Sequence, residues 1–324
     1  MPTCRFSVFA SVILMPLTLS VVRADVTLRY KMEVKTNAAL PARMAAGAMS
    51  QESLLRLKGG KGFSAAMGVD SIVDFTTKEI TILDTATKRY AKMTSDQFAQ
   101  EMARAMPEMP AQARAYMASM KADVSPARVT GGTAVIQGVE AEEREIAISI
   151  EGPAMPNVPP GPMVRMVVHL WSAKPGEVTR VPAIRELTGY ALWSFATMNP
   201  AAGMGKMMTQ IPGFPSLSEA LMKEMQKGAT VLRMRMDMFM PAMAAMLQQL
   251  PAGSNPLGVG FDPDAPFMQM NQELVEISTE PVPDSVFAIP EGYHEAPAAE
   301  LIKGQLAKSQ AAYGAGSNRP SGKR

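Results

Sequence analysis

The stretch DVTLRYKMEVKT, residues 25–36, alternates apolar and polar side chains with a period of two. Apolar residues occupy every second position from Val26 to Val34, and polar or charged residues occupy the positions between them. This period is typical of a strand that buries one face and leaves the other in water, as strands of antiparallel sheets do. We therefore predict a half-buried strand of an antiparallel sheet here.

Further short strands follow this one along the chain. Runs of strand-forming residues are separated by the segments GGKG, TTKE and DTATK, which are typical of tight turns. The expected strands are SLLRLK (53–58), SIVDF (71–75), KEITILD (78–84) and KRYAKM (88–93). This spacing predicts a meander, and it makes GGKG a hairpin turn and not a phosphate-binding loop.

The pattern changes to a helical one in three insertions. SDQFAQEMARAM and AQARAYMASMKA, with Ser95 as the expected cap, are rich in helix-forming residues, and Pro107 and Pro110 separate them. A second insertion follows Val181, and a third follows Pro215 and begins with a capping box of Ser216 and Glu219. The remaining strands are expected in ARVTGGTAVIQG, EREIAISIEG, MVRMVVHLWSA, TVLRMRMDMFM and MQMNQELVEIS.

These elements predict an α+β fold with one large, curved antiparallel β-sheet. The helical insertions are expected to cover its concave face, which would make the sheet a container for a ligand. We expect a single domain over residues 25–297, followed by a flexible basic tail over residues 298–324.

The amino terminus has the layout of a secretory signal peptide over residues 1–24. Arg5 precedes an apolar run that is too short for a typical membrane span, and Ala24 provides a small residue at the expected cleavage site. We expect a periplasmic or secreted protein without a stable transmembrane segment. Its mature chain would contain no cysteine, because Cys4 lies in the signal peptide.

Charge gives no reason to expect a nucleic-acid partner. Removal of Arg5 and Arg23 with the signal peptide leaves 30 basic and 30 acidic residues. A neutral chain has no general attraction to nucleic acid or to an anionic bilayer.

Several segments together resemble bacterial periplasmic proteins of uncharacterised function whose architecture is similar to the lipoprotein carriers LolA and LolB. The segments are SIVDFTTKEITILDTATKRYAKM, IQGVEAEE, the strand ending in HLWSA, and EPVPDSVFAIPEGY. The resemblance implies an open half-barrel sheet with helices over an apolar hollow, which holds acyl chains in the carriers. It implies no catalytic motif and no cofactor. The length, the methionine content and the helical segment 182–250 depart from the carriers.

The strand TVLRMRMDMFM carries the candidate binding residues. Alternation places methionines on one face, with Val231, Arg233, Arg235, Asp237 and Phe239 on the other, and the helix after the strand continues the apolar surface. The expected ligand-binding residues are Leu232, Met234, Met236, Met238, Met240, Met243 and Met246, the last two as part of a lid.

Three interpretations of these methionines are open. Methionine fills irregular space in cores, and methionine-rich surfaces also repack around variable apolar ligands. Thioethers are in addition soft ligands for copper(I), and Met234, Met236 and Met238 would be the site. The corresponding functions are an envelope-interaction module with a filled core, a carrier of lipid or of a lipid-modified chain, and a copper(I)-binding protein.

Catalytic signals are sparse. His169 lies in an apolar strand, where a structural histidine is the simpler interpretation, and His294 is expected to be solvated. The four glutamates of GVEAEEREI divide between the two faces of a strand, and Arg233 and Arg235 are expected on a charged strand back. The chain contains no G-x-S-x-G nucleophile motif. We therefore expect a non-enzymatic protein that binds an apolar ligand or an envelope protein partner.

Overall fold

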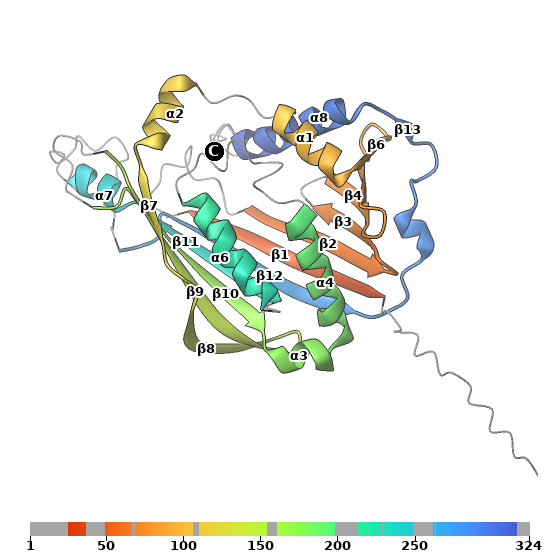
Figure 1. Ribbon diagram of the computed structural model, residues 1–324, viewed down its shortest axis with the longest axis horizontal. Coiled ribbons are helices and arrows are strands. Elements are labelled where there is room, and N and C mark those ends of the chain that lie inside the picture. The colour runs from red at the N-terminus through yellow and green to blue at the C-terminus, as the bar shows by residue number, and fades with distance from the viewer. Residues whose placement is uncertain are drawn as a thin grey trace, which may run out of the picture.

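The computed structural model describes residues 25–36, 49–66, 69–105, 110–153, 161–197, 213–227, 230–248, 262 and 264–315. The expected signal peptide and the end of the expected tail lie outside these residues. The fold is α+β, with a large, mostly antiparallel open sheet (Figure 1).

Thirteen strands form this sheet. In sheet order they are β13 (His294–Glu295), β6 (Arg89–Thr94), β5 (Glu79–Asp84), β4 (Val69–Asp74), β3 (Lys61–Ala66), β2 (Met49–Lys58), β1 (Val26–Thr36), β12 (Met268–Ser278), β11 (Val231–Phe239), β10 (Val164–Ala173), β9 (Val139–Glu151) and β7 (Lys121–Val124), while β8 (Arg128–Ile136) also pairs with β9. Only the short β13–β6 pair is parallel among these pairings.

The chain builds the sheet outward from β1 in two meanders. Strands β1 to β6 follow one another in sheet order, and the chain then crosses to the opposite end of the sheet. From there β9, β10, β11 and β12 return step by step until β12 pairs with β1. Strand β1 is therefore the junction of the two halves. The predicted meander over residues 53–93 is confirmed, with β3 as one further strand that the sequence did not indicate.

The helices occupy connections between strands, except for α8, which follows β13. They are α1 (Ser95–Ala105), α2 (Ala111–Ala118), α3 (Pro175–Arg180), α4 (Pro182–Thr197), α6 (Phe214–Gln226), α7 (Pro241–Gln248) and α8 (Ala298–Ala315). None of the helices that the structure describes combines the length and hydropathy needed to cross a bilayer.

Two predicted helix starts need correction. Thr94, and not Ser95, caps α1, because its hydroxyl accepts a hydrogen bond from the Gln97 N–H while the Gln97 side chain accepts one from the Thr94 N–H. Helix α6 begins at Phe214, before the predicted capping box, so Ser216 lies within its first turn. The Leu217 N–H donates to the Gly213 carbonyl instead.

Gly213 fits a position that a larger residue would strain. Its φ is +80°, and a Cβ atom there would lie 2.9 Å from the Cβ of Ala122 on β7. Glycine therefore lets the start of α6 lie close to the sheet.

The predicted domain boundary at residue 297 is too early. Helix α8 begins at Ala298, and its Leu301 and Ile302 are almost completely buried. They pack against Val73 and Ile80 of the sheet. The expected flexible tail is thus a packed helix in its first part, whose apolar pair the sequence analysis passed over.

One face of the sheet carries most of the core, and we call it the helix face. Helix α4 packs there against β1, β2, β11 and β12, α6 packs against β9 and β10, and α8 packs against β4, β5 and β6. In Figure 1, α4 and α6 run across the sheet and α1 and α8 lie side by side above the β3–β6 half. We call the opposite side the open face.

Candidate functional site

A pocket of about 350 Å³ lies on the helix face, between the sheet and helices α4 and α6. Most of its lining is apolar, and it comes from both halves of the sheet. The lining residues are Tyr30, Leu55, Leu170, Leu187, Tyr190, Ala191, Ser194, Leu221, Glu224, Thr230, Val231, Leu232, Arg233, Met234 and Gln272.

Helix α4 contributes one regularly spaced face to the pocket. Leu187, Ala191 and Ser194 lie four and three residues apart, so they share one side of the helix. Leu187 is buried, whereas Leu192 next to Ala191 is exposed.

Helix α6 contributes Leu221 and the carboxylate of Glu224. Leu217, Leu221 and Glu224 again follow helical spacing, and this places an acidic residue on the apolar stripe. The side chain of Glu224 is only 6% exposed. The sequence analysis missed it, although its spacing from Leu221 was a usable signal.

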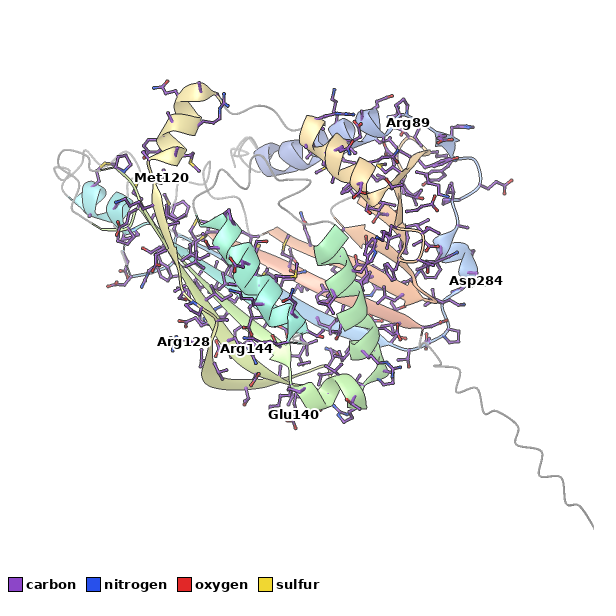
Figure 2. All side chains as sticks on the ribbon, viewed as in Figure 1. Arg89, Met120, Arg128, Glu140, Arg144 and Asp284 are labelled. Atoms are coloured by element: carbon purple, nitrogen blue, oxygen red, sulfur yellow. The ribbon has the colours of Figure 1, made fainter. Side chains whose placement is uncertain are left out.

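Two cations compensate the buried Glu224 carboxylate. Arg144 of β9, which Figure 2 shows beside α6, donates a hydrogen bond to it, and Lys227 donates another of 2.6 Å. Burial by itself raises the pKa of Glu224, but the hydrogen bonds from Lys227 and Arg144 outweigh it and lower the pKa overall. Glu224 therefore stays ionised, and it ties α6 to the sheet.

Apart from Arg233, the other polar residues of the pocket carry no charge. Burial raises the pKa of the Tyr30 hydroxyl well above its usual range, with a smaller contribution from Tyr190. Burial likewise raises the pKa of Tyr190. The hydroxyls of Thr188 and Thr230 hydrogen-bond to each other where α4 meets the start of β11. The pocket is thus an apolar space with a few polar groups at its border, as ligand pockets commonly are.

The structure brings only part of the predicted site to this pocket. Leu232 and Met234 line it, and Met236 lies beside it in the cluster of β9, β10 and α6. Met238 and Met240 are half-buried but are not among the lining residues. Met246 is 48% exposed, and the side chain of Met243 lies outside the described residues.

The prediction that Val231 lies on the face opposite the methionines is wrong. The pairing of β10 with β11 shifts between Trp171 and Ser172, so that Ser172 lies opposite Val231 while Trp171 lies opposite Arg233. Leu232 is the extra residue of this β-bulge, and a bulge interrupts the strict alternation of a strand. Val231 and Leu232 therefore both line the pocket.

His169 lies on the open face, away from the pocket. Its Nδ1 is 2.8 Å from Oε1 of Glu143, and its ring stacks on that of Trp171. The guanidinium group of Arg233 lies over the ring of Trp171 and donates a hydrogen bond of 2.7 Å to Glu273. These partners fit the structural histidine and the charged strand back that the sequence indicates. Arg233 is also among the residues that line the pocket.

Residues that could hold a metal through oxygen, nitrogen or thiolate are not grouped in this site. Over the part of the chain that the structure describes, no cluster of three or more His, Cys, Asp and Glu side chains is arranged to hold an ion. Comparison with models of known protein families gives no match, and comparison with curated proteins gives none.

Proposed function

We propose that this protein is a non-enzymatic carrier of an apolar ligand, namely lipid or a lipid-modified chain. In this proposal the sheet acts as a half-barrel similar to that of LolA, and α4 and α6 cover its hollow. The protein would work in the periplasm or outside the cell, after removal of residues 1–24.

The observation that carries the proposal is the apolar pocket under α4 and α6. Its volume of about 350 Å³ falls within the range of about 300–1,000 Å³ that is usual for ligand pockets. Leu55, Leu170 and Leu187 supply much of its wall. Each methylene group that moves from water into such a wall contributes about 0.8 kcal/mol of binding free energy before ordering costs.

The methionines beside the pocket extend this surface along β11. Met234 lines the pocket, and Met236 and Met238 follow at alternate positions on the same face. Methionine side chains are unbranched and adapt to partners of different shape. A chain longer than the pocket could thus continue over them without a fixed register.

A titration with a fluorescent long-chain fatty acid tests this function. Ala191→Trp places a large ring in the pocket, and Leu192→Trp, one residue away on the exposed side of α4, is the matched control. We expect Ala191→Trp to weaken binding at least about tenfold, equivalent to about 1.4 kcal/mol, and Leu192→Trp to bind like the original protein. Equal affinities of all three proteins would contradict binding in this pocket. No binding to any of them would favour the alternative of an envelope-interaction module with a filled core.

A further inference from the structure

We propose that five methionines of the helix face form a binding site for a soft monovalent cation, copper(I). They are Met236 and Met238 of β11, Met268 and Met270 of β12, and Met166 of β10. This site lies next to the apolar pocket, and it shares Met236 and Met238 with the surface proposed to extend that pocket.

The register of three strands brings the five residues together. Met236 lies opposite Met270, and Met238 lies opposite Met268. Met166 lies opposite Met238 on its other side. Residues that are directly opposite in an antiparallel pair extend to the same face of the sheet. The β11 and β12 methionines therefore occupy the corners of a rectangle, and Met166 lies beside one corner.

The dimensions of the rectangle suit convergence on one ion. Opposite residues have Cβ atoms about 5 Å apart, and alternate residues of a strand lie about 7 Å apart, so its centre is about 4 Å from each Cβ atom. The methionine sulfur lies two bonds beyond Cβ on a chain with three rotatable bonds. Three or four thioethers can thus turn toward the centre without a change in the backbone.

The surroundings favour a soft ion over a hard one. All five methionines are half-buried, and Met166 and Met236 also pack against the buried cluster of β9, β10 and α6. In the register positions that the structure describes, the residues opposite these methionines on neighbouring strands are Val34, Thr36, Val168 and Ile148, which carry no charge. Neutral sulfur ligands without a carboxylate select copper(I) over zinc, calcium or magnesium.

This ligand set differs from the one that alternation along a single strand suggests. Met234, which the sequence places with Met236 and Met238, lies opposite Leu170 and Gln272. It has no methionine across from it in either pairing, and it lines the apolar pocket. The site is therefore formed across strands and not along β11.

Anaerobic titration of the protein with copper(I), in competition with a colorimetric copper(I) chelator, tests this proposal. The test variant is Met236→Leu with Met270→Leu, and the control is Met93→Leu, a buried methionine of β6 on the other half of the sheet. Leucine keeps the volume and the apolar character of methionine but removes the sulfur. We expect one copper(I) per chain, affinity at least about 100-fold weaker in the double variant, and unchanged affinity in the control.

Methyl NMR of the methionines locates the ion independently of affinity. Copper(I) should shift the signals of the five named methionines and leave that of Met93 in place. Shifts spread evenly over the methionines, release of all copper(I) to a weak chelator, or an unchanged affinity in the double variant would each overturn the proposal.

The fatty-acid titration separates this site from the proposed carrier function. Ala191→Trp should lose the fatty acid and keep its affinity for copper(I), because it fills the pocket and leaves the five methionines in place. Met238→Leu with Met268→Leu, the other cross-strand pair, should lose copper(I) as the first double variant does. Retention of copper(I) by that variant would contradict the site.

Discussion

The two halves of the sheet use the helix face in different ways. On β4, β5 and β6, the side chains of Val73, Ile80 and Ile82 are almost completely buried beneath α1 and α8. On β10, β11 and β12 the same face carries half-buried methionines. Stiff β-branched residues fill the first half, whereas the second half combines buried Val168, Leu170 and Leu232 with flexible thioethers. The choice of apolar residue thus separates a closed core from an adaptable surface.

The largest expected difference between the halves is the loss in the free energy of unfolding when an apolar side chain is truncated to alanine. Ile80→Ala should reduce the free energy of unfolding by about 3–4 kcal/mol, because it leaves a cavity in a filled core. Met270→Ala should cost only about 1–2 kcal/mol, because its side chain is half-buried and its neighbours are flexible. Urea unfolding measures both values, and equal costs would remove the distinction between the halves.

The next largest effect is expected at the ion pair that joins α6 to β9, on the half of the sheet that carries the methionines. Among the described residues, Arg144→Met leaves Lys227 as the remaining cationic partner of the Glu224 carboxylate. We expect the free energy of unfolding to fall by about 2 kcal/mol. Breaking a fully buried pair costs about 3–5 kcal/mol, but Lys227 is exposed and can follow the carboxylate. Urea unfolding measures the loss. Glu219→Gln, which breaks the exposed pair with Lys223 on the same helix, is the control and should change stability little.

A smaller effect on stability is expected at the turns that connect β4, β5 and β6. Asp74 accepts hydrogen bonds from the backbone N–H groups of Thr76 and Thr77, at 2.9 and 3.0 Å. Asp84 makes the same bonds in the next turn, to Ala86 and Thr87. Asp74→Ala should cost about 1 kcal/mol. Thermal unfolding checks this, and an unchanged melting temperature would show that the turn does not depend on its aspartate.

The smallest expected effect is a pH dependence of the packing of α6. Because the folded-state pKa of Glu224 lies below its ordinary value of 4.5, its contribution is fully present above that value and is lost as pH falls through the folded pKa. Amide hydrogen exchange in α6 should therefore become faster in acid, after correction for intrinsic rates.

Helix α8 on the other half is the control for this measurement. Its Glu300 pairs with Arg89 at the surface, where the side chain of Glu300 is 57% exposed. Exchange in α8 should change less than in α6. An equal acceleration in both helices would indicate general acid unfolding and not the titration of Glu224.

Most strands and turns of the β1–β6 half can be predicted from local sequence signals. The alternation from Val26 to Val34 and the repeated aspartate turns fix short hairpins between neighbouring strands, and these need no long-range information. Strand β3 was missed because KGFSAA contains small residues and little alternation. Helix α8 was missed because its buried pair, Leu301 and Ile302, is embedded in a polar and alanine-rich segment.

The site was less accessible from the sequence, because residues far apart in the chain form it. Leu187 and Leu221 reach the pocket from two helices, and Tyr30 reaches it from the first strand. The bulge at Leu232 cannot be seen in the alternation of β11 alone, since it arises from the pairing with β10. Only the register places Met268 opposite Met238. The sequence indicated the methionine-rich strand but not its partners.

The most direct test of the carrier function is mass spectrometry of the organic extract of the natively purified protein. The account predicts an acyl-chain compound that is recovered from the original protein and from Leu192→Trp, and that is strongly reduced in Ala191→Trp. Recovery of no such compound, or of equal amounts from all three proteins, would contradict the claim that the pocket under α4 and α6 holds an apolar ligand.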